Sequence, residues 1–179
     1  SSPYSASKAS ADLLVQAANR TFGLNTIITR CSNNFGPFQF PEKLIPVVIN
    51  CIQESKMIPV YGNGKNIRDW IYVKDHCHGI LKALEFGKSG EIYNFGGNNE
   101  LSNIELIKIL IEFFESSESL ISFVDDRKGH DFRYSVDFSK ATKDLGWFPK
   151  TDFSNAIHET CAWYSKEKEN FEVIFKNIN

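Results

Sequence analysis

The stretch Asn25-Thr-Ile-Ile-Thr-Arg-Cys31 is short, apolar and β-branched, which is typical of a buried parallel strand. Good helix formers dominate the segment before it, from Ser5 to about Thr21, and Gly23 stands between the two where helices commonly end. A helix followed closely by a buried strand is the second half of an α/β unit. The sequence therefore predicts an α/β fold.

The rest of the chain continues this alternation of helices and strands. Ser102, followed three residues later by Glu105, has the pattern of a capping box, which predicts a helix start at Asn103. The expected helices cover Lys43 to about Glu54, Asp75 to about Phe86, Asn103 to about Glu115, Ser139 to Leu145 and Phe153 to about Asn170, and the expected strands cover Ile58–Tyr61, Arg68–Val73, Glu91–Phe95 and Leu120–Val124, with a short extended piece at Tyr134–Asp137.

The composition of the chain excludes several classes of protein. Among the 179 residues, 42% are hydrophobic and 23% are charged, so the chain can bury a core and is expected to be folded. The net charge of −2 and the lack of a basic block predict no nucleic-acid partner. No apolar run reaches the ~20 residues of a membrane span, so no membrane association is expected. Four scattered cysteines without C-x-x-C spacing predict reduced thiols and a cytoplasmic protein.

Tyr4 and Lys8 form the first candidate site. They stand four residues apart after a Ser-Pro pair that can begin a helix, and residues at i and i+4 share one helix face. A phenol is a poor base at neutral pH, but a neighbouring ammonium group favours its charged form. This pair is therefore suited to proton transfer. Such pairs also occur by chance on solvated helices, and the spacing alone leaves both interpretations open.

The segment Ser32-Asn-Asn-Phe-Gly-Pro37, directly after the predicted strand, is the second candidate site. We expect it to be a polar turn, and ligands of open α/β sheets bind beyond the carboxyl ends of strands. Asn, Gly and Pro are also the usual residues of ordinary turns, so a structural interpretation remains equally open.

Cations suited to an anionic ligand are dispersed along the chain. Lys43 opens a predicted helix, Arg68 lies in a predicted strand, and Arg127 and His130 lie in the polar loop 125–131. Together they predict a pocket for a phosphorylated or carboxylated molecule, because arginine matches diphosphate geometry. No metal site is expected, because His76 and His78 point to different helix faces. No G-x-G-x-x-G or G-x-x-G-x-x-G motif is present to hold a dinucleotide pyrophosphate.

Five motifs occur in the order and spacing of a known family: SPYSASKA (2–9), CSNNFGPFQFPEKLIP (31–46), IPVYGNGKNIRDWIYVKDH (58–76), EIYNFGGNNE (91–100) and DDRKGHDFRY (125–134). The chain resembles the extended short-chain dehydrogenases/reductases and, within them, the dTDP-glucose 4,6-dehydratase family. The resemblance extends from Ser1 to about Tyr164. It implies the C-terminal part of a Rossmann-type doubly wound parallel sheet plus a small α/β substrate-binding domain.

The resemblance also implies roles for individual residues. Tyr4 would take the proton from the 4-hydroxyl of a nucleotide-linked sugar as hydride passes to NAD. Lys8 would support Tyr4 and hold the nicotinamide ribose. Asn34 would contact NAD and Asn33 the substrate. The implied positions around the nucleotide diphosphate are Lys43, Leu44, Pro59, Val60, Tyr61, Arg68, Asn103, Asp126, Arg127, Lys128, Gly129 and His130.

The implied enzyme is a lyase that dehydrates dTDP-glucose to the 4-keto-6-deoxy sugar and acts as a homodimer. Phe35 and Lys128 depart from the usual tyrosine and proline of this family. The family's glycine-rich turn and Asp-Glu acid/base pair precede the tyrosine helix and are absent, and the chain starts without a methionine. We therefore expect a fragment that is inactive alone. The expected domains are residues 1–37 with 64–97, the end of the NAD-binding domain, and residues 38–63 with 98–179, the substrate-binding domain. A related epimerase or decarboxylase, or a non-catalytic sugar-nucleotide-binding module, remains an alternative.

Overall fold

The structure is a computed structural model in which residues 2–166 are described. It alternates helices and strands along the whole described chain, which confirms the predicted α/β class. The part of the predicted last helix and of the predicted second domain that falls on residues 167–179 lies outside the described residues. The elements are α1 (Pro3–Phe22), β1 (Ile28–Cys31), β2 (Asn33–Phe35), α2 (Leu44–Gln53), β3 (Ile58–Tyr61), β4 (Ile67–Tyr72), α3 (Val73–Phe86), β5 (Ile92–Phe95), β6 (Glu100–Ser102), α4 (Asn103–Phe113), the 3-10 turn η1 (Glu118–Leu120), β7 (Ile121–Val124), β8 (Arg133–Tyr134), α5 (Ser139–Leu145) and α6 (Phe153–Lys166).

Most strand pairs are parallel and join segments far apart in the sequence. β1 pairs with β5, and β3 pairs with β7, each in parallel. β4 is the central strand of a four-stranded sheet, where it pairs in parallel with β2 and β8 and antiparallel with β6. Parallel pairs need crossover connections, and the helices of this chain provide them.

The segment after β1 differs from the prediction. We expected Ser32–Pro37 to be a polar turn, but Asn33–Phe35 forms strand β2. Its register places Asn33 opposite Trp70 and Phe35 opposite Tyr72 of β4. Phe35 is buried in the core, so burial of this ring and the ladder with β4 outweigh the low strand propensity of two asparagines.

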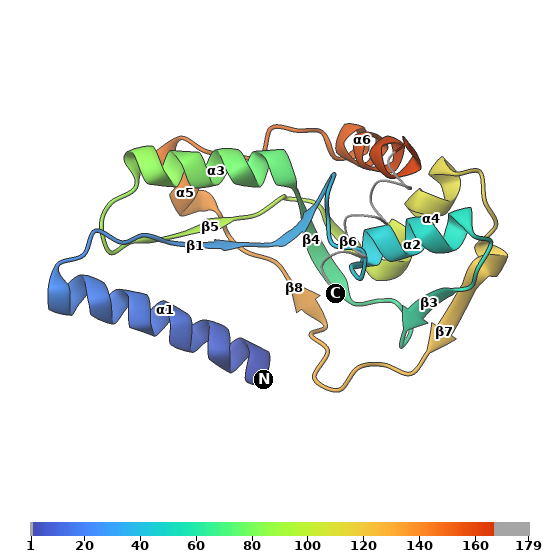
Figure 1. The fold of residues 1–179 in the computed structure, drawn as a ribbon, viewed down its shortest axis with the longest axis horizontal. Helices are drawn as coiled ribbons and strands as arrows, with labels where there is room; N and C mark the ends of the chain where they lie inside the picture. Colours follow the sequence, from blue (N-terminus) through green and yellow to red (C-terminus); the bar gives the residue numbers. More distant parts are fainter. Residues whose placement is uncertain (1, 167–179) are drawn as a thin grey trace.

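Helix α1 has clear start and stop signals, yet the described part of the chain covers its side chains only in part. The Ser2 hydroxyl accepts a hydrogen bond from the backbone N–H of Ser5, Pro3 occupies the first turn, and Gly23 ends the helix at φ 66°. None of its side chains is buried by the described residues. Figure 1 shows α1 and α3 on opposite sides of the β1–β5 pair.

Two hydrophobic clusters form the core. The larger one packs α2, α4 and α6 against β3 and β4, with Ile45, Leu106 and Ile157 fully buried. The smaller one packs α3 and α5 on β5 around Trp147, whose Nε1–H donates to the carbonyl of Asp75 over 3.1 Å. The clusters lie toward opposite ends of the view in Figure 1, with β4 between them.

The sequence correctly predicted where helix α4 starts, but hydrophobicity did not indicate which side of helix α3 is buried. The predicted capping box is present, because Ser102 and Glu105 exchange hydrogen bonds at the start of α4. In α3, by contrast, the small residues Gly79 and Ala83 face the core, while the larger Leu84 is exposed. Close approach of α3 to β5 selects small side chains, since a Cβ on Gly79 would overlap the ring of Phe95.

Candidate functional site

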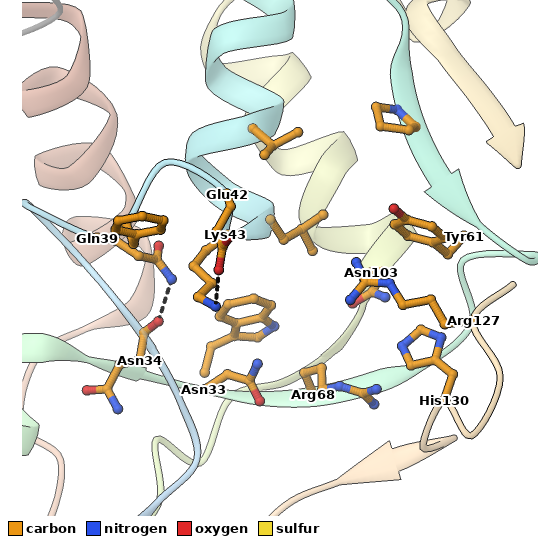
Figure 2. A pocket seen from close by; sticks show the side chains of 15 residues that line it. Asn33, Asn34, Gln39, Glu42, Lys43, Tyr61, Arg68, Asn103, Arg127 and His130 are labelled. Atoms are coloured by element: carbon orange, nitrogen blue, oxygen red, sulfur yellow. Dashed lines mark hydrogen bonds and ion pairs between the residues drawn. The ribbon is translucent and has the colours of Figure 1, made fainter. Parts of the chain in front are cut away.

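A cavity of about 750 Å³ opens between the four-stranded sheet, α2, α4 and the loop 125–131 (Figure 2). Its wall brings together ten residues that the sequence analysis had named, from three strands, two helices and one loop. The lining residues are Asn33, Asn34, Gln39, Phe40, Glu42, Lys43, Leu44, Val47, Pro59, Tyr61, Arg68, Trp70, Asn103, Arg127 and His130.

Strands β2 and β4 supply one wall of the cavity. Arg68 and Trp70 are two residues apart on β4, so they share one face of the strand. Asn33 is the register partner of Trp70 on the neighbouring strand β2. The pairing therefore sets an amide, an indole and a guanidinium side by side along the wall.

Two helices begin at the cavity. Lys43 is the N-cap residue of α2, and Asn103 is the first residue of α4; both line the wall. The N-terminal end of a helix carries a partial positive charge and unpaired N–H groups, which attract anions. The two helix ends add to the charge of the cationic side chains around them.

The cationic side chains are held by specific partners. The Arg127 guanidinium lies 4.1 Å from the ring centre of Tyr61. Arg68 donates from Nη2 to the carbonyl of Asp131 over 2.8 Å, and burial lowers the pKa of this guanidinium below its ordinary value. His130 Nδ1 lies 2.7 Å from Asp126 Oδ1, and this hydrogen bond lowers the pKa of the Asp126 carboxyl.

The acidic side chain in the wall does not cancel this positive character. Glu42 is exposed and lies 2.9 Å from the ammonium of Lys43, its neighbour in the sequence. Exposed ion pairs contribute little and exchange readily with solvent. Arg68, Arg127 and the two helix ends remain available to an anionic ligand, so the cavity suits a phosphorylated one.

Lys8 and Asn34 lie near Cys31 at the end of β1, and Tyr4 lies near Tyr134, which contacts the same cysteine. Asn34 Nδ2 donates to Cys31 Sγ over 3.1 Å. Burial raises the pKa of the Cys31 thiol, while the Asn34 hydrogen bond and the charge of Lys8 act in the opposite direction. Tyr134 donates its hydroxyl to the Cys31 carbonyl over 3.0 Å. Burial and the neighbouring Cys31 and Tyr4 raise the pKa of Tyr134.

Asn34 therefore belongs to both places. Its backbone carbonyl accepts a hydrogen bond from Gln39 inside the cavity, and its side-chain Oδ1 lies 2.9 Å from His76 Nδ1 on α3. Burial lowers the pKa of His76, so its ring is neutral near pH 7 and can donate from Nδ1 to the Asn34 oxygen. The asparagine is fixed through its main chain and its side chain.

Six residues named from the sequence lie outside the cavity wall. Val60 is buried in the larger core cluster. Asp126 supports His130, while Lys128 and Gly129 are exposed in the same loop. Tyr4 and Lys8 lie on α1, where Tyr4 is 72% exposed.

Five lining residues were missed from the sequence. Trp70 could have been predicted, because it lies two residues after Arg68 and therefore on the same face of the strand. Val47 could have been predicted in the same way, because it lies four residues after Lys43 on the same face of the helix. No comparable signal marks Gln39, Phe40 or Glu42, which lie in the irregular segment before α2.

Residues 2–166 contain no group of three or more His, Cys, Asp or Glu side chains arranged to hold a metal ion. None of its helices is both long enough and apolar enough to cross a membrane.

The fold and site define an α/β protein of Rossmann type with a cation-lined cavity beside its sheet. The family described as GDP-mannose 4,6 dehydratase matches residues 1–160. The chain belongs to this family.

Similar proteins include dTDP-glucose 4,6-dehydratases and, at lower identity, an epimerase of the same fold. A dTDP-glucose 4,6-dehydratase of Actinoplanes sp. is 53% identical over 163 residues, which cover 91% of this chain and 51% of the relative. The crystal structure of DesIV, a dTDP-glucose 4,6-dehydratase from Streptomyces venezuelae with NAD and TYD bound, is 45% identical with a TM-score of 0.92, covering 93% of this chain and 52% of that one. A UDP-glucuronic acid 4-epimerase from Bacillus cereus, in complex with UDP-glucuronic acid and NAD, is 26% identical with a TM-score of 0.88, covering 92% and 53%. The chain spans about half the length of the curated relatives it matches.

Proposed function

We propose that this chain forms the substrate-binding part, and a portion of the NAD site, of a dTDP-glucose 4,6-dehydratase. The observation that carries the proposal is the cavity, where two helix N-termini, Arg68 and Arg127 surround a space suited to a nucleoside diphosphate. The names of the relatives that are about half identical to the chain support the particular substrate.

NAD would supply the hydride chemistry, oxidising the sugar at C4 and reducing it at C6. Tyr4, Lys8 and Asn34 fit this group, because Lys8 and Asn34 lie near Cys31 and Tyr4 lies near Tyr134, which donates to the Cys31 carbonyl. The ammonium of Lys8 would favour the phenolate form of Tyr4, which would take the proton of the 4-hydroxyl and become neutral as hydride passes to NAD. Asn33, from the cavity wall, would hold the sugar beside them.

The proposal extends to the domains, the oligomeric state and the cellular location of the protein. Residues 1–37 and 64–97 would belong to the NAD-binding domain, and 38–63 and 98–179 to the substrate-binding domain. The protein would act as a homodimer through α1, whose exposed Leu13 and Leu14 are available for contact. A cytoplasmic location fits the free thiols of Cys31, Cys51, Cys77 and Cys161.

The test is the mass of the product formed from dTDP-glucose by the full product of the gene. Dehydration removes one water, so we expect the sugar nucleotide to lose about 18 mass units, a figure that follows from the elimination itself. An epimerase would leave the mass unchanged, and a decarboxylase acting on a glucuronate would release carbon dioxide.

Residues 1–179 alone provide a second measurement. The sequence contains no glycine-rich dinucleotide motif, so we expect this chain by itself to bind NAD weakly and to form no product. Turnover by residues 1–179 alone would contradict this expectation. If the full gene product binds dTDP-glucose without converting it, the non-catalytic alternative is favoured.

A further inference from the structure

The segment from Gly36 to Lys43, here called the cavity loop, connects β2 to α2. It places Gln39, Phe40 and Lys43 in the cavity wall. Its backbone is strained, because Phe38 has φ 64°, a left-handed conformation that residues other than glycine rarely adopt. Such a conformation persists only where surrounding contacts hold it.

Helix α6 supplies those contacts. The ring of Trp163 lies 4.6 Å from the ring of Phe38, centre to centre. Tyr164, the next residue, is buried and donates its hydroxyl to the carbonyl of Gln39 over 2.5 Å. Two adjacent aromatic residues of α6 thus hold two adjacent residues of the cavity loop, across 125 positions of sequence.

The side chain of Gln39 in turn contacts strand β2. Its Nε2 donates to the backbone carbonyl of Asn34 over 2.8 Å. The orientation of the amide is unambiguous, since the opposite one would set two oxygens against each other. Figure 2 shows Gln39 reaching from the cavity side toward Asn34, with this bond drawn.

We infer that Gln39 is a positioning residue that couples the sugar-nucleotide cavity to the cofactor side of the site. Tyr164 fixes the main chain of Gln39, and the side chain of Gln39 fixes Asn34. The bond from His76 then orients the Asn34 amide. The inference rests on the proposed function, in which Asn34 contacts NAD.

This arrangement has a measurable consequence. Gln39 lines the cavity for the sugar nucleotide, yet its loss weakens binding of NAD. A residue that merely supported the local fold would change thermal stability and leave NAD affinity unchanged. Cofactor affinity is therefore the quantity that separates the two roles.

The experiment replaces the amide by a carboxyl group of the same size, Gln39→Glu, in the full product of the gene. At pH 8 the charged carboxylate faces the Asn34 carbonyl and cannot donate a hydrogen bond. We expect NAD affinity, measured by calorimetric titration, to fall about tenfold or more. Burial and the facing carbonyl oxygen raise the pKa of the introduced carboxyl group, so lowering the pH toward 5.5 protonates more of it and should narrow the difference in NAD affinity between variant and parent.

Two controls match this variant. Gln53→Glu adds the same charge at the far end of α2, and we expect it to leave NAD affinity unchanged at every pH. Tyr164→Phe should lower NAD affinity in the same direction as Gln39→Glu but by less. Tyr93→Phe, which removes a buried hydroxyl bonded to the Lys88 N–H in the other core cluster, should lower only stability.

Equal NAD affinity of the parent and Gln39→Glu at pH 8 would overturn the inference and leave the proposed function intact. An equal loss of NAD affinity in Gln53→Glu would also overturn it, because added charge and not the missing donor would then be the cause. If the parent protein binds neither NAD nor dTDP-glucose, the proposed function fails and the inference fails with it.

Discussion

The cavity and the exposed face of α1 contrast sharply, although both carry residues named from the sequence. The cavity is assembled from strands, helices and a loop that pack on a fully buried core. Helix α1 carries Tyr4 and Lys8 but buries no side chain among residues 2–166. The difference indicates that the cavity wall is held in place by the core of this chain, whereas none of the side chains of α1 is fully buried by the described residues. Substitutions in the two regions should therefore affect different quantities.

The largest expected effect concerns α1. In the full product of the gene, Tyr4→Phe removes the hydroxyl that would accept the sugar proton and leaves the ring in place. We expect kcat for dTDP-glucose to fall by about 10²- to 10⁴-fold, with little change in substrate affinity. Steady-state kinetics would measure both. Unchanged kcat would remove Tyr4 from the reaction and leave the cavity as the only supported site.

The second prediction compares the stability contributed by a leucine of the core with that contributed by a leucine of α1. Leu110 on α4 is fully buried and Leu14 on α1 is 71% exposed. We expect Leu110→Ala to lower the free energy of unfolding by about 2–5 kcal/mol. Leu14→Ala should change it by less than about 0.5 kcal/mol where the protein is dilute enough to be monomeric, because the proposed dimer contact is then absent. Urea denaturation would measure both values. A large loss in Leu14→Ala would show that α1 packs against another surface in solution.

The third prediction concerns charge in the cavity. Arg127→Gln removes the guanidinium beside Tyr61, and we expect the affinity for dTDP-glucose to fall about tenfold. The difference should shrink as salt is raised, because mobile ions screen the interaction. Titrations at low and high salt would show this. Arg20→Gln, an equal change of charge in the last turn of α1, is the control and should have no effect on affinity.

The smallest expected effect is a pH dependence. Burial lowers the pKa of His76 in the folded protein, so below its unfolded pKa the unfolded chain binds more protons than the folded one. Stability from this group is complete above about pH 6.5 and is lost as the pH falls toward the folded pKa. Unfolding measurements from pH 7.5 to 5 on the parent and His76→Gln should show a steeper loss in the parent. Parallel curves would mean that His76 does not titrate in this way.

Local patterns predicted most helices and strands, but not how they pair. The start of α4 followed from Ser102 and Glu105, and the end of α1 from Gly23, because caps depend on neighbouring residues alone. Strand β2 was missed because its stability comes from β4, more than thirty residues away. The exposed side of α3 also could not be read from hydrophobicity, since close packing on β5 selects Gly79 over larger residues.

In the candidate site, too, individual residues could be predicted from the sequence but their contacts with one another could not. Cationic residues that are common in anion sites could be named individually, and the structure places Arg68, Arg127 and Lys43 in one wall. The meeting of Lys8 and Asn34 at Cys31 depends on where α1 and β2 lie relative to each other. Gln39 was missed because its contribution is a side-chain bond to a main-chain carbonyl, which any residue possesses.

The strand pairing described above also bears on how the chain reaches its native state. Ile28 pairs with Ile92, and Ile58 pairs with Ile121. The second pair begins inside the interval spanned by the first and ends beyond it, so the two ladders interleave. Both ladders can therefore form only after the chain has emerged from the ribosome as far as β7. High contact order of this kind slows folding, and we expect the protein to acquire its sheets late in synthesis.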